Sequence, residues 1–322
     1  MLNDPDRRPP PIIGSMLTLA SHRRDFLRAL LAAPAGLTLS FTASGQNAAP
    51  IKGSKLSANL ALVTGDGGNI AIVISKDGLL MVDSGLAERS GDLLSAVNEQ
   101  VDAHRITLVF NTHWHLDHVG ANELLGRAGS KIMAHETVKK RLSQKIVMEA
   151  LNRTVEPLKP EGLPTRTFNG AGQLNFGTQK IQYASVPPAH TDGDAWLFFP
   201  GPNVLHTGDL LFNGGYPFID DSTGGWIGGM VAAADAMLLT VDARTRIIPG
   251  HGPLATPDDL RASRDMLATV HERLAAMARQ GKTVDEAVAA APTKDLDAKW
   301  GAGFLKGENF TRIAYTGLLR HK

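Results

Sequence analysis

The chain has 322 residues, with 33 lysines and arginines against 32 aspartates and glutamates, which gives a formal net charge of +1. This balance argues against a nucleic-acid-binding protein, because such proteins need a large excess of basic residues on one surface. Cysteine is absent, so disulfides and thiolate metal sites are excluded, and any transition metal must use histidine and carboxylate ligands. A chain of this length can bury a large core as one large domain or two small ones.

The amino-terminal region predicts an export signal. Residues 21–28 read SHRRDFLR, with Arg23 and Arg24 side by side, and an uncharged, mostly apolar stretch follows at 29–39. A basic segment, a short apolar segment and then small residues are typical of a secretory signal, and this apolar segment is too short to span a bilayer. The string resembles a twin-arginine signal. We therefore expect the twin-arginine export machinery as a partner, a periplasmic location and no stable membrane anchor.

We assign residues 1–48 to this signal region and leave them out of the fold. Residues 1–15 fit no part of a signal, which makes Met16 a candidate start of translation. Cleavage is expected between 43 and 49, although no clear A-x-A motif identifies the bond, and an ordinary amphipathic helix is the alternative. Five arginines and three aspartates lie in this region, which leaves 28 basic and 29 acidic residues in the rest of the chain. That remainder again argues against a nucleic-acid partner.

Beyond residue 48, strand-like runs alternate with helix-like runs. Apolar runs at 68–75 and 78–85 flank Lys76 and Asp77, a pattern typical of a β-hairpin. Further strands are expected at 105–112, 131–135, 179–186, 195–199, 204–208 and 245–248. Helices are expected at 90–103, 119–129, 136–151, 229–240, 256–280, 284–291 and 308–319, with a Pro/Gly-rich connection at 157–177. The alternation predicts layers of sheets and helices over 49–255, and 256–322 is expected to be a helical carboxy-terminal part of the same domain.

Four metal-ligating side chains follow the expected strand at 105–112, in the string NTHWHLDHVG: His113, His115, Asp117 and His118. Residues two apart in an extended segment project to the same side, so His113 and His115 can reach one metal ion together. The chain then turns into a helix, which aims Asp117 and His118 toward a second ion. Four such groups in six residues would be unfavourable in a protein interior without a cation, so a solvated histidine-rich loop is the weaker alternative.

Three more candidate ligands lie just beyond expected strands. His190, Asp209 and His251 each follow an apolar run and have turn-forming glycines nearby. Open α/β sheets place their ligand sites beyond the carboxyl ends of strands. One histidine after a strand is more often an ordinary loop residue than a ligand. Four strand ends that each supply a histidine or an aspartate favour a shared metal site.

The motif H-x-H-x-D-H, followed by His, Asp and His, resembles the metallo-β-lactamase superfamily over roughly residues 55–255. The resemblance implies an α/β fold, an αβ/βα four-layer sandwich of two mixed β-sheets flanked by helices, with a catalytic domain at 49–255. It implies zinc, two ions per chain, with iron or manganese as alternatives. It implies a first site of His113, His115 and His190, a second of Asp117, His118 and His251, and Asp209 as a bridge. Asp83, at the end of a strand-like run, matches a position that supports the site from behind.

The ligand types indicate which branches of the superfamily the chain resembles most. An aspartate at position 209 and the absence of cysteine favour the glyoxalase II, lactonase or phosphodiesterase branches over zinc β-lactamases with a cysteine ligand. Glyoxalase II carries a carboxy-terminal substrate-binding domain that we cannot match to 256–322, and the expected export signal also argues against it. Flavodiiron relatives carry glutamate where His115 stands, and RNA-processing relatives need basic clamps.

The ligand set predicts hydrolysis. Two metal ions about 3.5–4 Å apart lower the pKa of water to about 7 and so supply a nucleophile. Asp117, the one predicted catalytic side chain, could orient this nucleophile or accept its proton. We therefore predict an exported dinuclear zinc hydrolase that acts on a small ester, lactone, thioester or β-lactam. The alternatives are a mononuclear iron oxygenase like the persulfide dioxygenases, which would use His113, His190 and Asp209, and a non-catalytic periplasmic metal-binding or relay protein.

A glycine-rich segment after Asp209 contains the aromatic residues Phe212, Tyr216, Phe218 and Trp226. These side chains either wall a substrate pocket or pack into the core. Tyr216 either donates a hydrogen bond to a developing oxyanion or has a structural role only.

Overall fold

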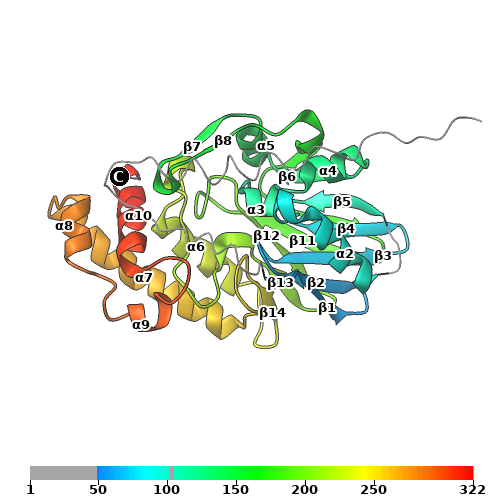
Figure 1. The fold of residues 1–322 in the computed structure, drawn as a ribbon. Helices are drawn as coiled ribbons and strands as arrows, with labels where there is room; N and C mark the ends of the chain where they lie inside the picture. The colour runs from blue at the N-terminus through cyan, green and yellow to red at the C-terminus, as the bar shows by residue number, and fades with distance from the viewer. Residues whose placement is uncertain (1–48, 102–104, 322) are drawn as a thin grey trace, which may run out of the picture. The chain divides into compact units, whose positions relative to one another are not determined.

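Two β-sheets lie at the centre of the computed structural model, which describes residues 49–101 and 105–321 (Figure 1). The larger sheet has seven strands in the order β1 (Lys52–Ser57), β2 (Leu60–Thr64), β3 (Ile70–Ser75), β4 (Gly78–Val82), β5 (Ile106–Phe110), β6 (Lys131–His135) and β9 (Arg166–Phe168). The smaller sheet has five strands in the order β10 (Ala171–Phe176), β11 (Gln179–Ser185), β12 (Ala195–Phe199), β13 (Val204–His206) and β14 (Arg246–Ile248). The expected signal region at 1–48 lies outside the described residues.

Both sheets are mixed, and their parallel strands determine where the strand ends meet. In the larger sheet β1 to β4 pair antiparallel, whereas β4, β5, β6 and β9 pair parallel. In the smaller sheet β10 to β13 pair antiparallel, and β13 pairs parallel with β14. Parallel neighbours end at the same edge of a sheet, so the loops after β4 and β5 lie together, as do the loops after β13 and β14.

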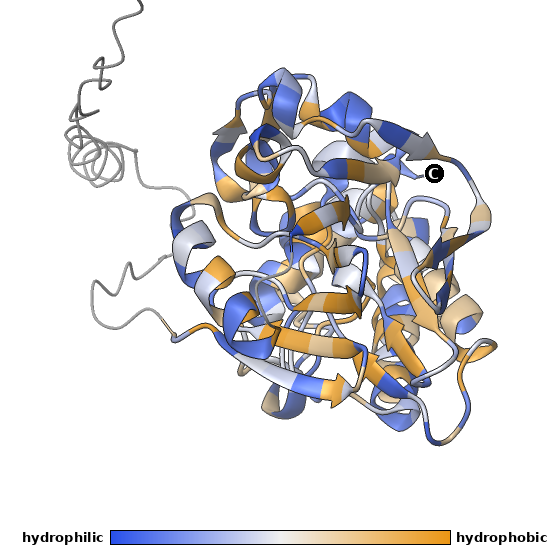
Figure 2. Cartoon of the chain, turned by 90° about the vertical axis from the view of Figure 1, so that its right-hand side faces the viewer, coloured by the Kyte–Doolittle hydropathy of each residue, from blue (hydrophilic) through white to orange (hydrophobic). Residues whose placement is uncertain are grey.

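The two sheets pack face to face because apolar side chains alternate along their strands. In β4, Leu80 and Val82 belong to the core between the sheets, whereas Leu79 and Met81 belong to a separate core on the outer face. Side chains two residues apart project to the same face of a strand, so β4 supplies apolar residues to two layers at once. Figure 2 shows these strands as predominantly hydrophobic bands.

Helices cover the two outer faces of this sandwich. Leu93 of α2 (Ser90–Gln100) packs in the outer core of the larger sheet. Leu205 and Ile247 of the smaller sheet pack in one core with α6 (Ile227–Leu238) and α7 (Pro257–Arg279). The remaining helices are α3 (Leu116–Val119), α4 (Asn122–Arg127), α5 (Glu136–Leu142), α8 (Val284–Ala289), α9 (Asp297–Trp300) and α10 (Gly307–Arg320). The predicted αβ/βα arrangement of two mixed sheets flanked by helices is confirmed. Within the described part of the chain, no helix has the length and apolar character that crossing a bilayer requires.

The predicted helix at 136–151 is wrong in its second half. Helix α5 ends at Leu142, and a separate two-stranded hairpin follows, formed by β7 (Ile146–Met148) and β8 (Arg153–Val155). Asn152 reverses the chain, because it adopts a left-handed conformation with φ of 46° that asparagine tolerates better than most residues. The apolar spacing of this segment fits either a helix or a strand, and burial of alternate side chains decides for the hairpin.

Three further differences between the expected and the observed elements concern strands and a helix boundary. The sequence analysis predicts neither β1 nor β2. Strand β1 is largely exposed and polar and lacks a clear alternating pattern, and β2 is a run of five residues, too short for its buried apolar side chains to show a period. The connection expected at 157–177 contains β9 and β10. The helix expected at 119–129 is divided into α3 and α4, with Gly120 between them.

Candidate metal centre

All seven predicted ligands lie in segments that follow the carboxyl ends of strands, with Asp117 and His118 in the short helix α3, and the structure brings them into two adjacent groups. The first group contains His113, His115, His190 and Asp209, whose ligand atoms lie within 4.8 Å of one another. The second contains Asp117, His118 and His251, with the same spread of ligand atoms. Both groups could hold a metal ion, because imidazole nitrogens and carboxylate oxygens are ligands for zinc, iron and manganese.

The first group is buried more deeply than the second. His115 Nδ1 and His190 Nε2 lie 2.9 Å apart, and His190 Nε2 lies 3.3 Å from Asp209 Oδ2. All four side chains are buried, and His115 and Asp209 reach the wall of a pocket.

The second group is more open to solvent. His251 Nε2 lies 3.2 Å from Asp117 Oδ2 and 3.4 Å from His118 Nε2. His118 is buried, whereas the side chains of Asp117 and His251 are 31% and 29% exposed. Access from solvent is therefore restricted to this side of the cluster.

Asp209 lies between the two groups. Its Oδ1 is 3.1 Å from His118 Nε2, and its Oδ2 is 3.4 Å from His251 Nε2 and 3.7 Å from His113 Nε2. Neither Asp209 Oδ1 nor His113 Nε2 has a hydrogen-bond partner with acceptable geometry, although both atoms are buried. A buried polar atom without a partner is costly, and a cation between the two groups removes that cost. The donor set and its unpaired atoms therefore fit bound metal ions.

Asp83 supports His118 from behind, as the sequence predicted. Asp83 Oδ2 lies 2.8 Å from His118 Nδ1, and the Asp83 carboxylate also accepts hydrogen bonds from the Thr112 amide and hydroxyl. This contact leaves His118 Nε2 directed at Asp209 and fixes the orientation of the ring. Asp83 has a φ of 65°, a conformation that non-glycine residues rarely adopt.

Asp220 is a supporting residue that the sequence analysis missed. Its Oδ2 lies 3.1 Å from His115 Nε2, which leaves His115 Nδ1 directed at the first group. Thr223 donates a hydrogen bond to the same carboxylate oxygen of Asp220. The only signal in the sequence was an acidic pair followed by Ser and Thr, which is typical of many surface turns. His190 is held in a similar way, because its Nδ1 donates to the carbonyl of Phe218 at 2.7 Å.

Two glycines allow the backbone to approach the ligands. A Cβ at Gly68 would overlap the ring of His118, and a Cβ at Gly250 would overlap the Oδ1 of Asp209. No other residue type fits at either position without moving a ligand. His206 is buried behind the ligands and accepts a hydrogen bond from the Gly208 amide.

The comparison with known families agrees with this geometry. The sequence profile of the Metallo-beta-lactamase superfamily matches residues 63–264, which include every residue of the two groups. The chain belongs to the metallo-beta-lactamase superfamily.

The chain is similar to proteins of this superfamily that have different names. A hydroxyacylglutathione hydrolase from Nitrosococcus oceani is 30% identical over 149 residues, which are 46% of this chain and 49% of that protein. The chain thus spans about half the length of this curated relative. The sec-alkylsulfatase Pisa1 from Pseudomonas sp. superposes with a TM-score of 0.63 at 18% identity, over 82% of this chain and 50% of that one. A metallo-beta-lactamase from Pontibacter korlensis superposes with a TM-score of 0.57 at 19% identity, over 68% of this chain and 99% of that one. These solved structures show that the fold is shared.

Histidines of the two groups differ in their charge when no metal ion is bound. Burial lowers the pKa of His113 well below its usual value and that of His190 to about 4, so both rings are neutral at pH 7. Burial also opposes charge on His118 and His251, but Asp209 and Asp117 outweigh it. They raise the pKa of His251 to about 9 and that of His118 well above its usual value. Without a metal ion, the second group therefore carries protons that compensate its carboxylates.

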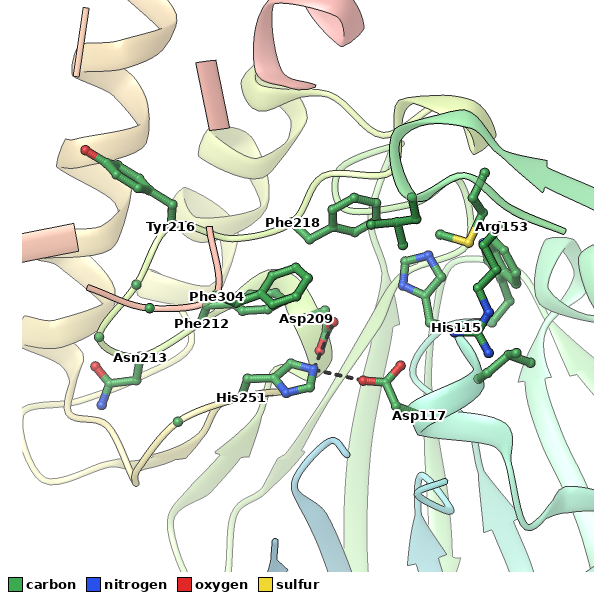
Figure 3. A pocket seen from close by; sticks show the side chains of 18 of the residues that line it. His115, Asp117, Arg153, Asp209, Phe212, Asn213, Tyr216, Phe218, His251 and Phe304 are labelled. Carbon is green, nitrogen blue, oxygen red and sulfur yellow. Dashed lines mark ion pairs between the residues drawn. The ribbon is translucent and has the colours of Figure 1, made fainter. Parts of the chain in front are cut away.

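A pocket of about 390 Å³ opens beside the second group (Figure 3). His115, Asp117, Asp209 and His251 line it, and Figure 3 shows all four side chains directed toward the same space. Its other walls are mostly apolar: Trp114, Leu116, Met148, Phe212, Phe218 and Phe304. A largely apolar pocket with a few converging polar groups is typical of a small-molecule site.

The structure decides between the two roles that the sequence left open for the aromatic residues. Phe212 and Phe218 line the pocket, and Phe212 stacks on His251 with ring centroids 4.8 Å apart. The ring of Tyr216 borders the pocket, but its hydroxyl points away and donates to Asp297 Oδ1 at 2.9 Å (Figure 3). Trp226 stacks on His321 instead. Tyr216 therefore has a structural role.

Replacing Asp220 with Asn is expected to weaken metal binding about 10- to 100-fold, because an amide cannot give His115 the same charged partner. Competition with a chromophoric chelator measures this affinity. The matched control is Asp77→Asn, which makes the same change in an exposed hairpin turn. Equal metal affinities for the two variants would contradict a supporting role for Asp220.

Zinc binding is expected to release protons, with an affinity that rises with pH. The raised pKa of His251, about 9, means that this ring is protonated at neutral pH in the metal-free protein. Zinc needs the neutral ring, so binding below that pKa must displace a proton. Calorimetric titration of the chelator-treated protein at about pH 7.5, in buffers of different ionisation enthalpy, measures the release. Heats that do not depend on the buffer would show that these histidines are already neutral.

Proposed function

We propose that the chain is a dinuclear zinc hydrolase that cleaves a small ester, lactone, thioester or β-lactam. The observation that carries this proposal is the pair of adjacent ligand groups on either side of Asp209, beside one pocket. A single metal site would not require a carboxylate directed at histidines of two groups. The superfamily membership and the relative named as a hydroxyacylglutathione hydrolase support the same class of reaction.

Each of the two ions would be held by its own set of residues. His113, His115 and His190 would hold one ion, Asp117, His118 and His251 the other, and Asp209 would contact both. Bound together, two zinc ions supply Lewis acidity and a nucleophile at neutral pH. Asp83 and Asp220 keep the rings of His118 and His115 oriented throughout.

Asp117 is the side chain best placed to handle a proton. Its carboxylate lines the pocket and is 31% exposed, whereas that of Asp209 is 4% exposed. Burial raises the pKa of Asp117, but His118 and His251 outweigh burial and keep the carboxylate ionised. It can therefore orient a proton donor in the pocket and accept its proton transiently. The apolar walls limit the water that reaches this carboxylate.

We also propose that the protein is exported to the periplasm by the twin-arginine route. The support is the sequence from 21 to 39, where Arg23 and Arg24 precede a short apolar stretch. Export of a protein in its folded state suits a centre whose ligands come from four separate loops.

Purified protein is expected to contain about two zinc ions per chain and to hydrolyse at least one member of an ester, lactone, thioester and β-lactam panel. His113→Ala should abolish hydrolysis and lower the metal content. Tyr216→Phe is the control: it removes only the bond to Asp297, and the rate should change less than the roughly 10²-fold that loss of an oxyanion donor costs. One equivalent of iron that zinc cannot replace, with oxygen consumption, would instead favour the oxygenase. Two zinc ions without turnover of any substrate would favour a metal-binding or relay protein.

Changing Arg23 and Arg24 together to Lys is expected to leave full-length precursor in the cytoplasm, because twin-arginine export depends on this pair. Cell fractionation and immunoblotting measure the distribution. The matched control changes Arg28 to Lys, because Arg28 precedes the same apolar stretch but lies outside the arginine pair. Unchanged export of the Arg23 and Arg24 variant would refute the signal.

A further inference from the structure

The β7–β8 hairpin forms one wall of the pocket, and its two faces differ in an unusual way. In the register of the hairpin, Ile146 lies opposite Val155 and Met148 lies opposite Arg153. Residues that pair directly, and residues two apart, share a face, so these four side chains project to the same side. Ile146, Met148 and Val155 are buried, which identifies this side as the inner face.

Arg153 is the one charged residue on that inner face. Val147, on the opposite face, is 57% exposed. A hairpin that only shielded the core would place the apolar side chain inside and the cation outside. Here the arrangement is reversed at these positions, and Arg153 lines the pocket together with Met148 and Val155.

The guanidinium of Arg153 is available to a ligand. Within residues 49–101 and 105–321, the side chain of Arg153 makes no hydrogen bond or ion pair, and Arg153 is the only lysine or arginine that lines the pocket. Figure 3 shows it on the same side of the pocket as His115, with Phe212 and His251 across from it. An anion bound there would lie at the opposite side of the pocket from His251.

Ion pairs outside the pocket hold the hairpin in place. Glu149, which follows β7, pairs with Arg320 of α10 at 3.2 Å. Arg320 also pairs with Asp221 at 2.7 Å, next to the Asp220 that supports His115. These pairs connect the wall that carries Arg153 to the loop that supports the ligands, and Met148 of the hairpin packs in the same core as Phe218.

We propose that Arg153 binds a terminal carboxylate of the substrate, whose apolar body lies between the hairpin and Phe212 while its scissile carbonyl lies at the metal centre. The preferred substrates are then acyl compounds with an apolar chain and an anionic end. This inference rests on the proposed hydrolase function. Arginine suits the role because its planar guanidinium pairs with a carboxylate through two parallel hydrogen bonds. Since Arg153 is exposed at the pocket mouth, the carboxylate keeps part of its hydration and the cost of burying it is small.

The test compares two esters that differ in one terminal group, 4-nitrophenyl pentanoate and mono-4-nitrophenyl glutarate. The wild-type zinc enzyme is expected to favour the anionic ester in KM, and Arg153→Met to lose about fivefold to tenfold of that preference. Arg153→Lys should keep part of the preference. Arg261→Met is the matched control, because Arg261 is exposed on α7, outside the pocket. Equal KM preference in Arg153→Met and wild type would overturn the proposal.

A binding measurement separates this inference from the proposed function. Calorimetry on the zinc-free protein compares 4-phenylbutyrate with 4-phenyl-1-butanol, so that no metal ion can bind the carboxylate. The wild type is expected to bind the carboxylate about fivefold more tightly than the alcohol, and Arg153→Met to bind both equally. If neither ester is hydrolysed but this difference is observed, the hydrolase proposal fails and the anion site stands. If the carboxylate preference is absent, or persists in Arg153→Met, the anion site is refuted.

Discussion

The carboxylate of Asp209 lies buried between two sets of imidazoles, and the remaining features of the centre depend on this placement. A buried carboxylate that faces four histidine nitrogens, with one of its own oxygens unpaired, is electrostatically incomplete as a purely protein cluster. Protons on His118 and His251 compensate part of that charge, and metal ions can compensate all of it. Burial keeps His113 and His190 neutral, whereas His118 and His251 are charged because each of them lies near more than one carboxylate.

Keeping these rings in place requires structure well beyond the ligand loops. The loop that carries Asp220 is fixed to the carboxy-terminal helices: Tyr216 stacks on Phe310 with centroids 4.5 Å apart, and His321 hydrogen-bonds the carbonyl of Gly224. The segment after residue 256 is therefore part of the support of the centre, and the connection between α9 and α10 contributes Phe304 to the pocket. The orientation of His115 depends in this way on packing more than a hundred residues away in sequence.

The sequence predicted which side chains come together better than it predicted their surroundings, for physical reasons. His113 to His118 form a local pattern, and a strand followed by a turn places their side chains without reference to distant residues. Asp220 could not be predicted, because its role arises only from the contact with His115 across the fold. The hairpin at 146–155 could not be distinguished from a helix, since its apolar spacing fits both and tertiary burial decides between them. The position of Arg153 in the pocket could not be predicted either, because it follows from the register of that hairpin.

The β7–β8 hairpin pairs only with itself, as a two-stranded sheet separate from the two large sheets of the described residues. Its backbone hydrogen bonds are internal, so a longer, shorter or differently composed hairpin would leave the ladders that carry the ligand loops unbroken. This segment is thus a module that natural variation or directed evolution can exchange, giving new substrate preferences around an unchanged set of histidines and aspartates.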